Sequence, residues 1–286
     1  MHDVVSPQLT PSVIVIVIGA GALHATWNAI TKQAPDRLVA FAWLSVASTV
    51  GGGLLLAFTG MPAGPAIGFA ITSAAIHLAY DLALMNSYRL GAFNQTYPLA
   101  RGTSPLVVAA GAFVLVHEEL SPLALAGVAA LAVGLMSLAF SAGRLSRGDL
   151  PAVGAAVLTG LTIAAYTIVD GIGVRRAGDP WAYAGLLFLL QGPAMAGLAA
   201  ARRPASAWRD YPTMRRGLLA GVLSLVAYGI VLWAQTRAPL AEVAAIRETS
   251  VVFAAVIGVL AFGEDFGRRR VAAALVIAAG IVLIGL

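Results

Sequence analysis

The chain of 286 residues contains no cysteine and only one lysine, Lys32. The lack of cysteine excludes disulfides, thiolate metal ligands and a cysteine nucleophile. A P-loop needs a glycine directly before its lysine, whereas Lys32 follows Thr31. The sequence therefore offers no P-loop, which argues strongly against ATP hydrolysis by this chain.

Charged side chains of any kind are scarce. They make up 11% of the residues, against 59% that are hydrophobic, whereas a soluble domain carries about 25% charged residues. This composition predicts an integral membrane protein surrounded by a lipid bilayer. The formal net charge of +5 comes from arginine; it bears on membrane topology, and we expect no nucleic acid as a partner. The first twelve residues lack a basic segment, so we expect no cleaved signal peptide.

Several enzyme motifs are also missing. The segment His117–Ser121 reads HEELS rather than HExxH, and Gly19 and Gly21 lack the third glycine of a dinucleotide-binding loop. No Gly-x-Ser-x-Gly elbow occurs. These absences count against an intramembrane enzyme that acts on a lipid-linked substrate, and we expect no cofactor or metal. A scaffold or receptor subunit would need an extramembrane domain, for which the short links between apolar segments leave no room.

The apolar residues fall into ten segments long enough to cross a bilayer, since a helix of about 20 residues spans the hydrocarbon core. The predicted fold class is therefore all-α and integral to the membrane, with ten transmembrane helices. Proline lies at or just before several predicted starts, where its missing N–H costs nothing. The expected helices are Pro11–Thr31, Leu38–Thr59, Pro65–Tyr88, Phe93–Val116, Pro122–Phe140, Leu150–Val174, Pro180–Ala200, Met214–Thr236, Leu240–Phe262 and Arg270–Leu286.

One stretch of the first half returns in the second half. Residues 101–119, RGTSPLVVAAGAFVLVHEE, align with residues 247–265, RETSVVFAAVIGVLAFGED, at an offset of 146 positions. The chain therefore divides into residues 11–140 and 150–286, each with five predicted helices. Because five is odd, the second copy must enter the membrane from the opposite side, which makes an inverted repeat. Such repeats are typical of transporters with a site near the bilayer midplane, although duplicated helices can also serve stability alone.

Each copy of this stretch begins with an arginine inside an apolar run, Arg101 and Arg247. A charge at the centre of a membrane helix costs roughly 3 kcal/mol or more, so it is rarely without a role. The guanidinium fork matches carboxylate and phosphate groups, which favours an anion-binding site. The alternative is that each arginine only locks helices together by pairing with an internal acid such as Asp81 or Glu248. We expect both arginines to reach a central water-filled cavity.

Other polar and aromatic side chains lie where lipid-facing positions would be aliphatic. His77 and Asp81 are four residues apart, so they share a helix face and either relay protons or simply hydrogen-bond to each other. The aromatic residues either form a wall for a substrate or anchor helices at the membrane interface. Glu118 and Glu264, at helix ends, are expected to cap or pair with loop backbone. The candidate substrate-binding residues are Trp27, Asn28, His77, Tyr80, Asp81, Tyr97, Arg101, Tyr166, Trp233 and Arg247.

Three features together carry a resemblance to a known family. They are the pair Trp27-Asn28, a proline inside the fourth predicted helix, and the phrase VHEELSPLALAGVAALAVGLM with its echo FGEDFGRRRVAAALVIAAGIVLI. The chain resembles the ten-helix EamA branch of the drug/metabolite transporter superfamily, and within it the amino-acid exporters, including the aromatic amino-acid exporters. The resemblance implies two inverted five-helix repeats around a cavity lined by the first, third, fourth, sixth, eighth and ninth helices. Because Val251 stands where the first copy has Pro105, we do not expect the fourth and ninth helices to kink alike.

The function that this resemblance implies is secondary transport. We expect a monomeric, multi-pass protein of the bacterial inner membrane that exports amino acids or related small metabolites by alternating access. A multidrug or nucleotide-sugar-type carrier on the same fold is the alternative.

The arginines also predict an orientation, because basic residues in short links stay in the cytoplasm. With ten helices both termini share one side, and the links on that side hold Arg175, Arg176 and Arg237. This count predicts both termini outside the cell, whereas the resemblance implies termini in the cytoplasm. The links of the opposite side hold thirteen basic residues, namely Lys32, Arg37, Arg89, Arg144, Arg147, Arg202, Arg203, Arg209, Arg215, Arg216, Arg268, Arg269 and Arg270.

Overall fold

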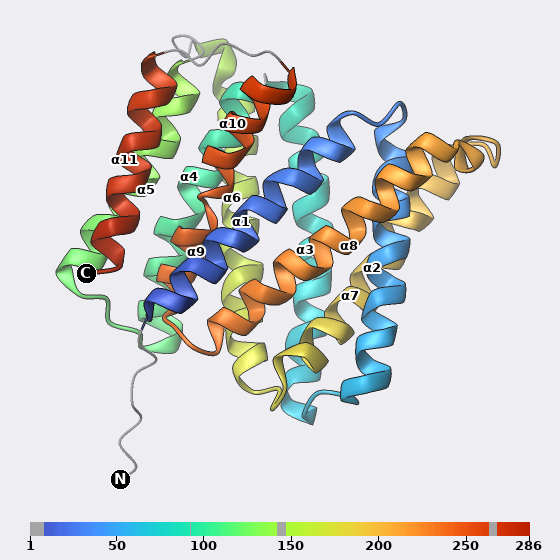
Figure 1. The fold of residues 1–286 in the computed structure, drawn as a ribbon, viewed down its shortest axis with the longest axis horizontal. Coiled ribbons are helices and arrows are strands. Elements are labelled where there is room, and N and C mark those ends of the chain that lie inside the picture. Colours follow the sequence, from blue (N-terminus) through green and yellow to red (C-terminus); the bar gives the residue numbers. More distant parts are fainter. Residues whose placement is uncertain (1–8, 92, 142–146, 263–267) are drawn as a thin grey trace.

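The computed structural model describes residues 9–91, 93–141, 147–262 and 268–286, and within these ranges every regular element is helical (Figure 1). The longer helices lie side by side as one bundle. Two short 3₁₀ turns, η2 (Arg147–Asp149) and η3 (Ala207–Arg209), precede α6 and α8. The helices are α1 (Pro11–Lys32), α2 (Arg37–Thr59), α3 (Gly64–Leu90), α4 (Phe93–Gly111), α5 (Pro122–Ser141), α6 (Leu150–Arg175), α7 (Pro180–Arg202), α8 (Tyr211–Gln235), α9 (Leu240–Arg247), α10 (Ser250–Phe262) and α11 (Arg268–Ile284).

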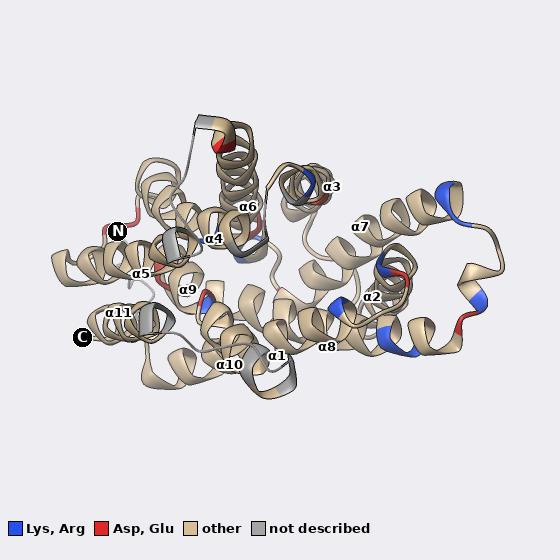
Figure 2. Ribbon diagram, turned by 90° about the horizontal axis from the view of Figure 1, so that it is seen from above, with Lys and Arg blue, Asp and Glu red and all other residues tan. Residues whose placement is uncertain are grey.

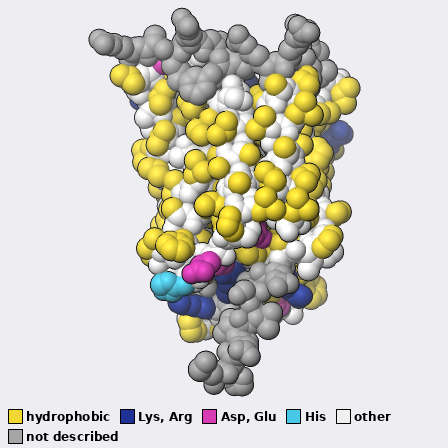
Figure 3. Space-filling view, turned by 90° about the vertical axis from the view of Figure 1, so that its left-hand side faces the viewer, with side chains coloured by type: hydrophobic (Ala, Val, Ile, Leu, Met, Phe, Trp, Pro, Cys, Tyr) yellow, Lys and Arg dark blue, Asp and Glu magenta, His cyan; other side chains and the backbone are white. Residues whose placement is uncertain are grey.

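The chain is a multi-pass membrane protein by the length and composition of its helices. Among the described residues, eight helices are long and apolar enough to cross a membrane, and Val271–Ile284 forms a shorter apolar helix. The face around α5 and α11 carries a broad band of hydrophobic side chains (Figure 3). Exposed leucines and valines such as Leu275 and Val133 suit a lipid environment.

The predicted helix bounds agree with the observed ones to within three residues for eight of the ten expected segments. Proline occupies the first or second position of α1, α3, α6, α7 and α8, as expected from the sequence. Side chains of Asp36, Asp179 and Asp210 cap the N-termini of α2, α7 and α8. Arg203 Nε also donates to Asp36 at 2.6 Å, and this hydrogen bond lowers the pKa of the Asp36 carboxyl.

The prediction of a continuous ninth helix is wrong. Residues 240–262 form two helices, α9 and α10, separated at Glu248 and Thr249. The N–H groups of Glu248, Thr249 and Val251 bond to carbonyls three residues earlier, which tightens the backbone out of the α-helical pattern. The hydroxyls of Thr249 and Ser250 have no hydrogen-bond partner among the described residues, so they do not explain the break.

The fourth predicted helix stays helical despite its prolines. α4 contains Pro98 and Pro105 and continues into a wider π-helical turn, η1 (Ala112–Val116). The two copies of the repeated stretch therefore differ in backbone shape, as expected. The helix that is interrupted, however, is the one in the second copy, which has Val251 in place of the proline.

Glycine allows the closest helix crossings. A Cβ atom on Gly52 of α2 would lie 2.6 Å from the carbonyl oxygen of Gly185 on α7. On the opposite side of the bundle, a Cβ on Gly127 of α5 would lie 2.6 Å from the carbonyl oxygen of Gly280 on α11. Small residues at such crossings let helix backbones approach closely in lipid. α1 begins and α11 ends at the same end of the bundle (Figure 1), while the orientation of that end stays a prediction.

The glycine run of α2 offers a matched test of this packing. We expect Gly52→Ala to destabilise the protein by about 1–3 kcal/mol, because the added methyl group meets the backbone of α7. Gly53→Ala should be neutral or slightly stabilising, since its nearest neighbour would be Leu189 Cδ1 at 4.0 Å and alanine favours a helix over glycine. Unfolding of the two purified variants in detergent measures the difference. Equal stability of both variants would contradict the close crossing.

Candidate functional site

A buried cavity of about 40 Å³ lies where α1, α3, α4, α6, α8 and α9 meet. These are the helices that the resemblance implied around a central cavity, although only the first piece of the ninth contributes. A water molecule needs at least about 10–15 Å³ of such space, so the cavity has room for about three waters. The lining residues are Ala20, His24, Tyr80, Arg101, Tyr166, Ala227, Tyr228, Val231 and Arg247.

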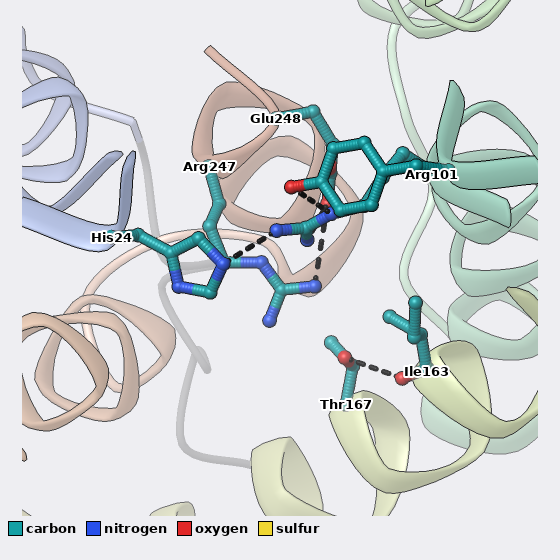
Figure 4. A network of polar contacts seen from close by, with 7 residues as sticks. His24, Arg101, Ile163, Thr167, Arg247 and Glu248 are labelled. Carbon is teal, nitrogen blue, oxygen red and sulfur yellow. Dashed lines mark hydrogen bonds and ion pairs between the residues drawn. The ribbon is translucent and has the colours of Figure 1, made fainter. Parts of the chain in front are cut away.

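Two arginines share one carboxylate at this cavity (Figure 4). Arg101 Nη1 lies 3.1 Å from Glu248 Oε1, and Arg247 Nη2 lies 3.4 Å from the same oxygen. All three side chains are almost entirely buried, with residue exposures of 5%, 4% and 0%. The cluster therefore carries one positive charge in excess, and a buried charge is stable only where it is paired.

His24 completes the cluster from α1. Its Nε2 lies 2.7 Å from Arg101 Nη2. A guanidinium only donates hydrogen bonds, so Nε2 must accept and the ring must be neutral, with its hydrogen on Nδ1. Arg101 Nε also donates to the hydroxyl of Tyr97 at 3.3 Å. Among the described residues, Arg101 thus has three hydrogen-bond partners, whereas Arg247 has one.

Some buried polar atoms in this region have no hydrogen-bond partner among the described residues. They include Arg247 Nε, Glu248 Oε2, and the hydroxyls of Thr249 and Ser250 at the break between α9 and α10. An unsatisfied buried polar atom costs about 1–3 kcal/mol. Of these residues only Arg247 lines the cavity, so its Nε is the unpartnered atom best placed to meet a ligand there.

Aromatic rings form the other wall. The centroid of Tyr166 lies 4.0 Å from His77 in a stacked arrangement, 5.6 Å from Tyr80 and 6.2 Å from Tyr228. Tyr80, Tyr166 and Tyr228 all line the cavity. The cavity is therefore cationic on the side of α4 and α9 and aromatic on the side of α3, α6 and α8.

The remaining candidates from the sequence lie outside the cavity lining. Trp27 packs edge-on against His24 at 5.0 Å, and Asn28 donates to the His24 carbonyl oxygen at 2.8 Å. The ring of Trp233 lies under Arg237. Neither Arg101 nor Arg247 forms an ion pair with Asp81 in the described part of the chain; Glu248 is the acid that they share. His77 Nδ1 bonds to the carbonyl oxygen of Ser73, four residues before it.

Sequence reasoning missed His24, Tyr228 and Glu248 as site residues. His24 and Tyr228 were detectable, because each lies on a polar face of an expected helix. Glu248 was predicted only as a possible partner of an arginine.

Glu118 is structural, as expected. Its Oε2 accepts from the N–H of Leu240 at 2.7 Å, at the start of α9, and its Oε1 pairs with Arg175. Arg175 also donates to the carbonyl oxygens of Gln235 and Ala238. Glu118 thus fixes the start of the buried helix whose last residue is Arg247. The matching Glu264 lies outside the described residues.

We expect Glu118→Ala to lower stability by about 1.5–3 kcal/mol, the usual value of hydrogen bonds to a charged group. It should also reduce activity, because α9 would lose its anchor. Glu119→Ala, an exposed neighbour, is the control. Thermal unfolding in detergent measures both, and an unchanged Glu118 variant would contradict this role.

The comparisons with known proteins agree with a membrane transporter. Residues 150–286 match the model of the EamA-like transporter family. This EamA match starts at the first residue of α6 and indicates a membrane transporter of small molecules. No curated protein matches the chain. Of 29 matching solved chains, one crystal structure superimposes with a TM-score of 0.77 over 98% of this chain and 99% of its own, at 17% identity. That likeness concerns the fold alone.

Proposed function

We propose that the protein is a secondary transporter that exports amino acids, or closely related carboxylates, by alternating access. The observation that carries the proposal is the excess of guanidinium over carboxylate at a buried cavity. Arg101 and Arg247 face a single acid, Glu248. A carboxylate ligand would complete the charge balance and would receive charge-assisted hydrogen bonds.

Arg247 is the better donor for a substrate carboxylate. Its Nε has no partner among the described residues, and its bond to Glu248 is the longer of the two. Arg101 is engaged by Glu248, His24 and Tyr97. We infer that Arg101 positions Glu248, while Arg247 binds the substrate.

The ammonium group of an amino acid would face the aromatic side. Tyr80, Tyr166 and Tyr228 present ring faces and edges around the cavity, and a cation over a tyrosine ring gains about 0.5–2 kcal/mol. Glu248 Oε2 is a second acceptor within the same site. A zwitterion therefore satisfies both sides of the cavity, which favours amino acids over amines or simple anions.

Two inverted repeats are part of the proposal, and helix contacts support them. Gly21 of α1 packs against Thr249, and Gly160 of α6 packs against Thr103. Position 21 corresponds to 160 at an offset of 139, and 103 corresponds to 249 at an offset of 146. A helix of the first half, α1, thus contacts the repeated stretch of the second half, and the matching helix of the second half, α6, contacts the repeated stretch of the first half.

The contacts between α5 and α11 repeat in the same way. The pair Gly127 and Gly280 maps at an offset of 146 onto Ala273 and Gly134, which are also in close contact. Two structurally equivalent halves around one site would produce such matching pairs of contacts. Because the cavity is smaller than an amino acid, binding and release require the halves to move apart on one side at a time.

Counterflow in proteoliposomes tests the function. Vesicles with the purified protein and unlabelled L-phenylalanine or L-threonine inside should accumulate the labelled amino acid from outside. Phenethylamine, which keeps the ammonium group but lacks the carboxylate, should not compete with L-phenylalanine. Vesicles without protein give the background.

The other functions predict different outcomes. Efficient competition by phenethylamine and unrelated cations would favour a multidrug carrier, and uptake of nucleotide sugars would favour that class. Turnover of a labelled lipid-linked substrate without solute movement would identify an enzyme. Each of these results would reject amino-acid transport as proposed.

A further inference from the structure

A second buried acid lies next to the cavity without lining it. Asp170 of α6 has no exposed surface. The hydroxyl of Tyr183 on α7 donates to its Oδ1 at 2.9 Å, and the hydroxyl of Tyr228 on α8 donates to its Oδ2. Two helices of the second half thus hold one carboxylate through tyrosine hydroxyls.

No cation balances this carboxylate in the described structure. None of the ion pairs formed by described residues includes Asp170. The facing groups are Ser73 and His77 of α3, Tyr166 of α6, Tyr183 of α7 and Tyr228 of α8. Arg101 of α4 and Arg247 of α9 both lie near Tyr166, and Arg247 also lies near His77 and Tyr228, but the ion pairs that these arginines form in the described structure are with Glu248. A buried carboxylate without a cation is costly when ionised, so a proton is its natural partner.

The surrounding groups accommodate both protonation states. When Asp170 is ionised, both tyrosines donate to it. When it is protonated, its own O–H needs an acceptor, and a tyrosine oxygen can accept as well as donate. His77 Nδ1 bonds to a carbonyl oxygen at 2.9 Å, so this nitrogen carries hydrogen and the ring can take a further proton only on Nε2. Asp170 therefore has a hydrogen-bond partner in both protonation states.

Tyr228 connects this acid to the substrate cavity. The same side chain lines the cavity and donates to Asp170. His77, which faces Asp170, stacks on Tyr166, which also lines the cavity. One residue therefore separates Asp170 from a bound ligand, and movement of α3 against α6 and α8 would alter its surroundings.

We propose that Asp170 is a proton-binding site that couples substrate export to proton entry. The inference rests on the proposed function. In the proposed cycle Asp170 binds a proton after the substrate departs, whereas a substrate ammonium beside Tyr166 and Tyr228 favours the carboxylate. The proton passes from Asp170 Oδ2 to the oxygen of Tyr228, which releases its own hydroxyl proton to water in the cavity. One proton leaves for each substrate that binds, and one returns after the substrate departs.

Gradient-driven transport tests this coupling. Proteoliposomes are loaded with labelled L-phenylalanine, or with L-threonine as second probe, and the outside is made more acidic. One proton per substrate predicts an about tenfold steady-state concentration ratio for each pH unit. Asp170→Asn should hold a ratio near one yet still perform counterflow at equal pH. Glu119→Gln, which removes an exposed carboxylate, should behave as the wild type.

The outcomes separate the two proposals. Wild-type vesicles without counterflow would reject amino-acid transport itself. Counterflow without gradient-driven accumulation, or a full tenfold ratio in Asp170→Asn, would overturn the role of Asp170. If Asp170→Asn does not fold, wild-type vesicles that contain a pH-sensitive dye provide the test. Substrate exit without matching proton entry would then also overturn the role of Asp170.

A second variant reports on the carboxylate without touching the cavity. Tyr183→Phe removes the donor to Asp170 Oδ1 and leaves Tyr228 in place. The midpoint of the transport pH profile should move upward by about one to two pH units, because the ionised form loses a hydrogen bond. A merely structural Asp170 would leave the midpoint unchanged.

Discussion

Replacing Arg247 by glutamine should raise the half-saturation concentration for amino-acid counterflow about 10- to 150-fold. The range corresponds to about 1.5–3 kcal/mol for hydrogen bonds between a charged donor and a carboxylate. The variant should still fold, because Arg101 and Glu248 remain as a neutral pair at 3.1 Å. The half-saturation concentration of Arg247→Lys should lie between those of the wild type and Arg247→Gln, since lysine keeps the charge but not the planar fork.

Arg209→Gln is the matched control, because Arg209 lies exposed in the link between α7 and α8. Basic and acidic residues both occur along this end of α7 and α8 (Figure 2). The control variant removes the same charge at a distance from the cavity and should leave the half-saturation concentration unchanged. An Arg247→Gln protein with wild-type affinity would show that the substrate carboxylate binds elsewhere.

Replacing Glu248 by glutamine should produce the largest loss of stability in the cluster, about 3–5 kcal/mol, as for other broken buried ion pairs. The change leaves Arg101 and Arg247 buried together with no acid between them. The double variant Arg101→Gln/Glu248→Gln should recover part of the loss, because only one buried charge remains. Arg101→Gln alone leaves Arg247 and Glu248 as an ion pair without net charge, so it should lower stability the least of these three variants.

Unfolding of the purified variants in mixed micelles, monitored by tryptophan fluorescence, measures their order of stability. Glu119→Gln provides the control for loss of an exposed acid. A Glu248→Gln protein as stable as the wild type, or a double variant less stable than the single one, would contradict the shared-carboxylate arrangement.

The sequence predicted most of the helices because membrane burial depends on length and hydropathy, which can be read directly. It also indicated that Arg101 and Arg247 both reach a central cavity, since both are costly in lipid and occupy matching positions. Glu118 could be assigned a structural role because an acid at a helix end has few other partners. These inferences need only composition, periodicity and the internal repeat.

The break after α9 could not be predicted in the same way. Hydropathy does not register a change from i−4 to i−3 hydrogen bonds, so residues 240–262 look like one apolar helix. The matching position in the first half, Gly102, lies against Met136 and Ala132 of α5. Glu248, by contrast, lies beside the break and contacts Arg101 and Arg247.

The aromatic residues show a second limit. Trp27 and Tyr166 occupy matching positions, and both were expected in the substrate wall. Tyr166 lines the cavity, whereas Trp27 supports His24 from outside it. A helical period identifies the buried face of each helix, but which buried residue comes nearest the cavity depends on how the helices cross.

An experimental structure with a bound amino acid tests the central claim most directly. With L-phenylalanine at saturating concentration, we expect its carboxylate within hydrogen-bond distance of the Arg247 guanidinium and its ammonium group beside Tyr166 and Tyr228. Glu248 should remain with Arg101. An amino acid bound away from these helices, or a saturated protein in which Glu248 still holds both arginines and the cavity stays empty, would contradict the account.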